Sequence, residues 1–300
     1  ILELLENKDF PQLGNLLKDM NPADVAELFE DLPREKMALV FRLLPKELAA
    51  DAFAYMNPDE QTVLVEAFSD KELHDVVNEL YVDDAADMIE EMPANLVKRI
   101  LRHTDAETRV LINQILNYPK DSAGSIMTME YVDLKRGMTV EEAFDRIRAI
   151  GVEKETVYTC YVTDSRRKLK GIVTVKDLLL APKNELIRNI METNIIYVST
   201  HTDKEEVAQL FRKYDLLALP VLDKDGLMVG IVTFDDAMDV MVEEATEDIT
   251  KMAAINPSEK TYFNTSTFAH AKNRIPWLLI LMLTSIITGT IITKYEDAFA

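Results

Sequence analysis

The side chains best suited to bind a ligand form an acidic stretch at residues 235–248. Half of its residues are carboxylates and none is basic. At about 100° per residue, a helix would place four of these carboxylates on one narrow face: Asp236, Asp239, Glu243 and Glu247. Apolar side chains, among them Met238 and Val242, fall on the opposite face. Because carboxylates one turn apart repel each other, the stretch predicts a helix whose charged face attracts cations.

The overall composition limits the classes of function. A chain of 300 residues is long enough for two or three domains. Its net charge of −20 argues against nucleic acid as a partner, because binding phosphates requires clustered Lys and Arg. The single cysteine, Cys160, excludes an internal disulfide and indicates a reducing compartment. Because it lies in the apolar run 157–162, we expect a buried strand residue rather than a nucleophile.

Residues 1–118 have a helical pattern with prolines ahead of short amphipathic runs: Pro22, Pro33, Pro45, Pro58 and Pro93. The run at 22–33 recurs at 82–93, and short helices that repeat in this way indicate a helical solenoid. Asp83 and Asp87 are four residues apart and share a helix face, as a divalent-cation site would require. The alternative is a plain scaffold.

From residue 121 to about 239 the chain alternates short strands and helices, and it does so twice. The first copy predicts a strand at 131–134, a helix at 139–149 and a strand at 157–163. The second predicts a strand at 195–199, a helix at 204–214 and a strand at 218–222. Each copy ends in Gly-Ile-Val-Thr-x-x-Asp, which leads into a helix. This paired β-α-β-β-α order resembles tandem cystathionine-β-synthase (CBS) domains, the Bateman module.

In the CBS family the Thr-x-x-Asp ending can hold the ribose of a nucleotide. The resemblance therefore suggests Thr174, Asp177 and Pro220 as nucleotide contacts. Alternatively, Thr174 and Thr233 only cap the helices that follow them. In the second copy the surrounding carboxylates would repel phosphate, so cation binding is favoured there.

An uncharged apolar segment covers residues 275–292, about the minimum length that spans a bilayer. Trp277 lies near one end, and Lys272 and Arg274 mark the preceding side as cytoplasmic. The alternative is a buried helix of a soluble core. Its Thr, Ser and Gly residues suggest packing against further helices.

This order of parts resembles the MgtE family of magnesium channels. The acidic N-terminal helices, the CBS pair, the acidic helix and the run Arg274-Ile275-Pro276-Trp277-Leu278 carry the resemblance. It implies a homodimer through the CBS domains and a cytosolic Mg²⁺ sensor that closes the pore when internal magnesium is sufficient. Mg²⁺ is then both the regulatory and the transported ion. The resemblance also allows ATP as a second ligand, and the residues alone do not decide this. The pore of that family lies in five membrane helices, of which at most the first is represented here.

The resemblance also implies the cation ligands. They are Asp51, Asp83, Asp87, the backbone at Ser125, Asp203, Glu205, Asp215, Asp236, Asp239, Glu244, Glu247 and Asp248. Repulsion between carboxylates about 4 Å apart would hold the parts open, by roughly 4 kcal/mol per pair at an effective dielectric of 20. Mg²⁺ would bridge them and favour the closed state.

Two other classes of function remain to be weighed. An enzyme is not expected, because the four histidines are scattered and match no catalytic spacing: His74, His103, His201 and His270. In an adenine-nucleotide sensor, the CBS pair would bind ATP or AMP, and the acidic surface would serve only to keep the protein solvated. A peptide-binding adaptor is disfavoured by the clustered charge.

The predicted fold class is multidomain. An all-α helical-repeat N-terminal domain occupies residues 1–120, and an α+β tandem CBS module occupies 121–183 and 184–242. A connecting helix, called the plug helix in the family, and a linker cover 243–268, and one candidate transmembrane helix begins within 269–300. The protein is expected in the cell membrane, with residues before about 270 cytoplasmic.

Overall fold

The computed structural model describes residues 2–252 and 267–299. The chain divides into two units within helix α15 (Phe234–Met252), the first from Ile1 to Ala237 and the second from Met238 to Ala300. The first unit contains the N-terminal helices and the CBS pair, and each unit is described by itself.

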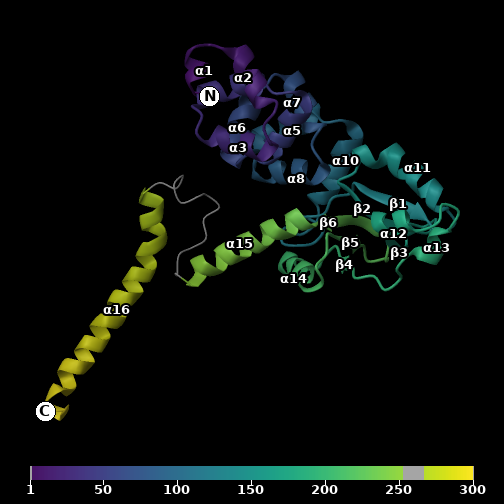
Figure 1. Cartoon of the computed structure of the whole chain (residues 1–300). Coiled ribbons are helices and arrows are strands. Elements are labelled where there is room, and N and C mark those ends of the chain that lie inside the picture. The colour runs from purple at the N-terminus through teal and green to yellow at the C-terminus, as the bar shows by residue number, and fades with distance from the viewer. Residues whose placement is uncertain (1, 253–266, 300) are drawn as a thin grey trace. The chain divides into compact units, whose positions relative to one another are not determined.

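The N-terminal part of the first unit is built from ten helices (Figure 1). They are α1 (Leu2–Glu6), α2 (Phe10–Leu17), α3 (Pro22–Glu30), α4 (Arg34–Phe41), α5 (Lys46–Ala54), α6 (Pro58–Ala67), α7 (Asp70–Val77), α8 (Val82–Glu91), α9 (Ala94–His103) and α10 (Ala106–Ile115). Alternate helices pack on each other: α3 on α5, α5 on α7 and α7 on α9, and likewise α4 on α6, α6 on α8 and α8 on α10. This stacking is the arrangement that the helical repeat predicted.

Aromatic side chains fill the middle of this stack. The rings of Phe29, Phe53 and Phe68 surround Phe41, with centroid separations of 5.0–6.3 Å. Phe29 and Phe53 are fully buried. Their tilted and edge-on geometries are the favourable arrangements for aromatic pairs, so the cluster contributes specific contacts as well as buried area.

The prolines start helices in two ways. Pro22 and Pro58 are the first residues of α3 and α6, where an asparagine caps the helix ahead of each. Pro33, Pro45 and Pro93 lie one residue earlier, at the N-cap of α4, α5 and α9. Proline fits both positions because neither requires its backbone to donate a hydrogen bond within the helix.

Each CBS domain contains a three-stranded sheet. The first has β1 (Tyr131–Lys135), α11 (Val140–Ile150), η1 (Gly151–Glu153), β2 (Thr156–Thr163), β3 (Leu169–Thr174) and α12 (Val175–Leu180). The second has α13 (Ile187–Ile190), β4 (Val198–Ser199), α14 (Lys204–Tyr214), β5 (Ala218–Leu222) and β6 (Met228–Thr233), followed by α15 (Phe234–Met252). In both sheets the first two strands are parallel and the third is antiparallel, with orders β1-β2-β3 and β4-β5-β6.

The predicted strand at 195–199 is mostly wrong, because only Val198 and Ser199 pair, with Val221 and Leu222 of β5. The preceding residue Glu192 instead bridges to Ile172 of β3 in the first domain. The chain must therefore cross from one sheet to the other between these points, and the residues on the way find no strand partner. Thr128, ahead of β1, makes the corresponding bridge to Ile231 of β6.

In the second unit, α15 continues from Met238 to Met252, and Met238, Val242 and Ile249 of its apolar face are exposed. Helix α16 runs from Thr267 to Phe299. Within it, Ile275–Lys294 has a mean hydropathy of 2.1 and is long and apolar enough to cross a membrane. Residues 253–266, most of the predicted linker, lie outside the described residues.

Candidate functional site: an acidic cluster between α8 and the CBS domains

Helix α8 supplies three of the carboxylates, Asp83, Asp84 and Asp87. Asp83 is buried, Asp84 is half-buried, and Asp87 lies at the exposed rim. Asp83 and Asp84 lie in the first turn of the helix, where the dipole favours negative charge, and Asp87 lies near its middle. That effect is small beside the cost of burying a carboxylate, so the position of Asp83 needs another explanation.

The CBS domains supply the opposing carboxylates. Glu130 precedes β1 and accepts hydrogen bonds from the Val82 backbone N–H at 3.3 Å and the Thr128 hydroxyl at 2.8 Å. Glu155 precedes β2 and is half-buried. Asp236 lies in the first turn of α15 and accepts a 2.5 Å hydrogen bond from the Thr233 hydroxyl. Four segments far apart in the sequence thus bring their negative charges to one region.

The electrostatics show how strongly these groups interact. Burial, and then the charge of Asp236, raise the pKa of Asp83 well above its usual value. The same two causes raise the pKa of Asp84 to about 7, with Asp235 and Glu130 adding to the shift. Burial and the charges of Asp235 and Asp84 raise the pKa of Glu155 to about 8. At neutral pH these groups therefore hold protons that isolated carboxyls would release.

Asp87 is shifted in the same direction, to a pKa of about 7, by surrounding atoms and then by the charges of Asp236 and Asp84. Its side chain is nevertheless exposed. Because solvent screens a group at the rim, Asp84 and Glu155 are the principal titrating members of the cluster.

Two carboxylate oxygens in the cluster are buried without a hydrogen-bond partner, Asp83 Oδ1 and Glu155 Oε2. A buried acceptor with no partner is costly, and a bound cation is one of the groups that would satisfy it. Within residues 2–252 and 267–299, however, no three His, Cys, Asp or Glu side chains are arranged closely enough to hold a metal ion. The donor set suits a hard cation that keeps several waters, rather than a closed protein cage.

The other predicted N-domain ligand, Asp51, lies on α5 with an exposed side chain. Burial and the charges of Glu47 and Glu79 raise its pKa. Its own charge in turn adds to the raised pKa of Asp84. Asp51 therefore belongs to the same electrostatic neighbourhood as α8.

The predicted ligands around α14 separate into two places. Asp203 caps α14 by accepting a 2.9 Å hydrogen bond from the Glu205 N–H. Ser122 forms a β-bridge with Asp203, so the turn that contains Ser125 lies beside these two carboxylates. Asp215 ends the same helix in a left-handed conformation with φ of 51°. A helix of 11 residues is roughly 16 Å long, so Asp215 cannot share an ion with Asp203.

The remaining predicted cation ligands lie on the part of α15 that belongs to the second unit: Asp239, Glu244, Glu247 and Asp248. Glu247 forms a 2.5 Å ion pair with Lys251, one turn further on. The helix itself agrees with the sequence prediction. The binding of ions along it stays a prediction.

The predicted nucleotide residues cap helices. The Thr174 hydroxyl donates a 2.5 Å hydrogen bond to Asp177, whose backbone N–H donates back to Thr174, which completes a capping box at α12. Pro220 is buried in β5. Thr174 therefore caps α12, and a nucleotide would have to bind beside this box or displace one of its bonds. The assignment of Thr174, Asp177 and Pro220 as nucleotide contacts stays a prediction.

Sequence reasoning missed Asp84, Glu130 and Glu155 as members of the acidic cluster. Asp84 adjoins Asp83, and that adjacency was a usable signal. Glu130 and Glu155 lie in the segments leading into β1 and β2, where no periodic pattern marks which side chains are buried.

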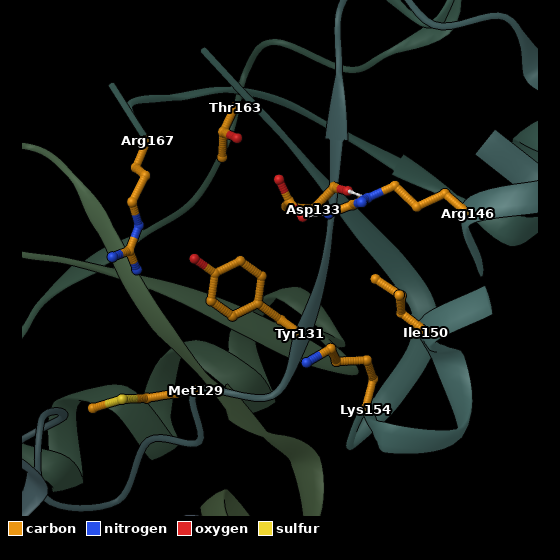
Figure 2. Close-up of a pocket in the computed structure, with 8 residues that line it drawn as sticks. All are labelled: Met129, Tyr131, Asp133, Arg146, Ile150, Lys154, Thr163 and Arg167. Carbon is orange, nitrogen blue, oxygen red and sulfur yellow. Dashed lines mark hydrogen bonds and ion pairs between the residues drawn. The ribbon is translucent and has the colours of Figure 1, made fainter. Parts of the chain in front are cut away.

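A separate pocket of about 410 Å³ is lined by residues of β1 and α11, the segment before β2, the end of β2 and the turn before β3 (Figure 2). Three of its lining residues are basic, Arg146, Lys154 and Arg167, and one is acidic, Asp133. Its charge is thus opposite in sign to that of the acidic cluster.

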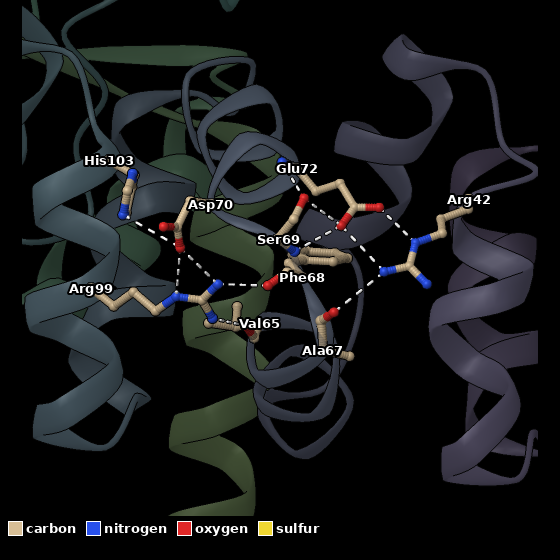
Figure 3. Close-up of polar contacts among 9 residues, drawn as sticks. All are labelled: Arg42, Val65, Ala67, Phe68, Ser69, Asp70, Glu72, Arg99 and His103. Atoms are coloured by element: carbon tan, nitrogen blue, oxygen red, sulfur yellow. Dashed lines mark hydrogen bonds and ion pairs between the residues drawn. The ribbon is translucent and has the colours of Figure 1, made fainter.

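A second polar group, in the N-terminal helices, is structural. Arg42 and Arg99 hold the two sides of the turn between α6 and α7 (Figure 3). Arg42 pairs with Glu72, and this pairing is the main reason that the pKa of Glu72 falls to about 2. All of these partners are internal to the stack, which argues for a role in stability.

Comparison with known families agrees with the two-part architecture. The family model described as the MgtE intracellular N domain matches residues 20–121. The CBS domain model matches twice, at residues 123–184 and 187–243. The fold thus defines the class of protein, in which a helical N domain of the MgtE type is joined to a CBS pair.

Sequence and structural relatives define the family. The chain is 37% identical over 299 residues to the magnesium transporter MgtE of Thermus thermophilus, an alignment that covers 98% of this chain and 66% of that protein. It is 31% identical to MgtE of Bacillus subtilis, with 99% and 66% covered. A solved cytosolic domain of the Mg²⁺ channel MgtE in complex with ATP superposes with a TM-score of 0.76 at 37% identity, covering 80% of this chain and 98% of that one.

This chain belongs to the MgtE family. It spans 66% of the length of the two transporters that it matches. The family resemblance expected from the order of parts is therefore confirmed, as is the fold class of a helical N domain, a CBS pair and one apolar C-terminal helix.

Proposed function

We propose that this chain is the cytosolic Mg²⁺-sensing and gating region of a magnesium channel or transporter. The observation that carries the proposal is the acidic cluster, in which buried carboxylates from α8 and the CBS domains raise each other's pKa and leave Asp83 Oδ1 without a partner. Bringing these carboxyl groups together raises the free energy of the closed arrangement, and a bound divalent cation would lower it again.

The mechanism follows from differential binding. When the N domain lies against the CBS pair, carboxylates of both come into one region, where a hydrated ion can bridge them, and when it moves away they do not. Mg²⁺ therefore stabilises the closed arrangement by as much as it binds that arrangement more tightly than the open one. In metal-free conditions the same carboxylates repel and favour separation. We propose that the acidic residues of α15 from Asp239 to Asp248 bind further ions.

Small-angle scattering during a Mg²⁺ titration tests this mechanism directly. The sample is residues 1–267, since the cytosolic domain of a relative crystallised by itself. The titration runs from EDTA to tens of millimolar Mg²⁺, with NaCl at matched ionic strength as the salt control. We expect the radius of gyration to fall with Mg²⁺ and not with NaCl.

The chain offers a matched pair of variants. Asp84 on α8 and Asp24 on α3 hold equivalent places in the repeated run, but Asp24 is exposed and outside the cluster. Asp84→Asn should weaken the Mg²⁺ response, and Asp24→Asn should leave it intact. If the dimensions of the particle do not change with Mg²⁺, the bridging mechanism is wrong for this chain.

Adenine-nucleotide sensing is the second candidate, favoured by the solved relative that contains ATP. Thr174, Asp177 and Pro220 are the residues we propose for it. Calorimetry with ATP, with and without Mg²⁺, separates the two functions. If ATP binds, Thr174→Ala abolishes that binding, and Mg²⁺ causes no change in scattering, then nucleotide sensing is the favoured function.

We further propose that the whole protein lies in the cell membrane as a homodimer through its CBS domains, with the residues before about 270 in the cytoplasm. The supporting observations are the apolar span in α16 and the names of the relatives as transporters. In that setting Mg²⁺ is also the transported ion.

A further inference from the structure

The pocket beside β1 combines a hollow with a surplus of positive charge in the CBS region. It is about 410 Å³, within the range of small-molecule sites. Tyr131, Met129 and Ile150 give it an apolar wall, and basic side chains give it charge. In a chain of net charge −20, such a grouping is unexpected for a surface selected only for solubility.

Its single carboxylate is already neutralised. Arg146 pairs with Asp133 Oδ1, and Lys135 binds Asp133 Oδ2 at 2.8 Å. Burial raises the pKa of Asp133, but these two hydrogen bonds outweigh it and hold the pKa below its usual value. Asp133 therefore remains charged and saturated, and it cannot also neutralise Lys154 or Arg167.

Lys154 and Arg167 have no carboxylate within ion-pair distance among the side chains that the structure describes. The charge of Lys154 lowers the pKa of Glu130, but the Glu130 carboxylate is bonded to Val82 and Thr128 instead. In Figure 2 the Arg167 guanidinium lies on one side of the Tyr131 ring and the Lys154 ammonium on the other.

The backbone of Arg167 is also unusual, with φ of 62° in the left-handed region. That conformation costs about 1 kcal/mol or more for a residue other than Gly, Asn or Asp. It is held by contacts with the second CBS domain, because the Arg167 carbonyl accepts from the Met228 N–H at 3.0 Å and its guanidinium donates to the Met228 carbonyl at 3.1 Å. The turn thus fixes a cation over the pocket and retains free N–H donors on it.

We propose that this pocket binds a small molecule carrying a doubly charged phosphate group, with Lys154 and Arg167 as its charged contacts and Tyr131 against its organic part. Arg167 can supply a planar fork of donors and Lys154 a point charge, the pairing that phosphate recognition commonly uses. The site is separate from the Thr174–Asp177 turn and from the acidic cluster. It does not depend on Mg²⁺ sensing, so each proposal can fail without the other.

Isothermal titration of the 300-residue chain in non-ionic detergent and EDTA tests the proposal. The probes are inorganic phosphate and ribose 5-phosphate, which separate free phosphate from a phosphate ester as the recognised form. Either probe should bind to the wild-type chain. Lys154→Gln should raise its Kd about tenfold, the effect of losing one charge-assisted contact.

Arg166 provides the matched control, because it is exposed in the same turn but does not line the pocket. Arg166→Gln should leave the Kd within about twofold, whereas Arg167→Gln should raise it as Lys154→Gln does. Lys154→Gln does not touch the bonds to Met228, so it stays informative if Arg167→Gln folds poorly. Absence of binding, equal losses in all three variants, or binding that only Thr174→Ala removes would each overturn the proposal.

Discussion

The backbone N–H of Val82, the first residue of α8, donates a 3.3 Å hydrogen bond to the carboxylate of Glu130, which leads into β1. One of the N–H groups that a helix leaves unsatisfied at its start is thereby satisfied by the next domain. This hydrogen bond holds the beginning of α8 against the CBS pair. It also explains why Asp83, the next residue, is buried among other carboxylates.

The first prediction concerns Asp83. Asp83→Asn replaces a carboxyl that is buried with one oxygen lacking a partner and that must take up a proton or carry an unpaired charge there, so we expect the metal-free protein to gain about 1 kcal/mol in the free energy of unfolding. That gain corresponds to a rise in Tm of roughly 2–4 °C in EDTA for a unit of this size. Thermal unfolding followed by circular dichroism measures it.

The same variant should lose part of the stabilisation that Mg²⁺ confers, because a ligand stabilises only the state that binds it. Asp24→Asn, at an exposed site of α3, is the control and should change neither quantity. A metal-free protein that becomes less stable on Asp83→Asn would show that the carboxylate has a favourable partner and would contradict this account.

The second prediction concerns protons. The pKa values of Asp84 and Glu155 lie at about 7 and about 8, above those of carboxyls in an unfolded chain. The folded state therefore binds more protons than the unfolded state across this interval. The associated stability is complete below the ordinary carboxyl pKa and is lost as the pH rises through 7 and 8. Tm in EDTA should accordingly fall between about pH 6 and about pH 8.5.

The third prediction follows from the same pair of groups. A cation that binds to Asp84 and Glu155 must displace their protons, so Mg²⁺ binding should release protons near neutral pH and tighten as the pH rises. Calorimetric titrations in buffers of different ionisation enthalpy measure the number released. Heats that do not vary with the buffer would mean that Mg²⁺ binds elsewhere.

The fourth prediction concerns Arg99. Its guanidinium donates to the carbonyls of Val65 at 2.8 Å and Phe68 at 2.5 Å and also pairs with Asp70 (Figure 3). It thus joins α9 to the end of α6 and the start of α7. A lysine cannot reach both carbonyls and the carboxylate at once, so Arg99→Lys should cost about 1–3 kcal/mol in urea unfolding. Arg102→Lys, at an exposed position of the same helix, should cost under about 0.5 kcal/mol.

Local patterns predicted much of this fold. The helix at 204–214 and the strand at 218–222 have the bounds that their periodicity gave, because both are bordered by strong turn signals. The helical repeat was likewise visible because the helices are short and several of them begin at a proline. These features depend on neighbours in sequence.

The site was less predictable, because its members meet through tertiary contacts. Periodicity placed Asp83 and Asp87 on one helix face, yet one is buried and the other exposed, since only the start of α8 meets Glu130. Glu155 lies in a connecting segment, where no pattern distinguishes a buried carboxylate from a solvated one. The members of the cluster differ from other carboxylates in how deeply they are buried, not in residue type.

The last prediction concerns two glycines at equivalent places in the CBS pair. A Cβ on Gly230 would lie 2.6 Å from the Thr128 carbonyl, and one on Gly171 would lie 2.7 Å from Met191 Sδ and 3.0 Å from the Glu192 carbonyl. These carbonyls take part in the two bridges that join the sheets, Thr128 to Ile231 and Ile172 to Glu192. A side chain at either glycine must therefore push the two CBS domains apart.

We expect Gly230→Ala and Gly171→Ala each to lower the free energy of unfolding by about 1–3 kcal/mol, as overpacking against backbone usually does. Gly137→Ala is the matched control, because a Cβ there meets nothing within 4 Å, and reduced freedom of the unfolded chain should leave it neutral or slightly stabilised. Gly171→Ala should be the milder of the two, since part of its clash is with the flexible end of a methionine, whereas Gly230→Ala meets a backbone carbonyl directly. Equal unfolding midpoints for Gly230→Ala and Gly137→Ala would show that the bridge between the sheets can shift without cost.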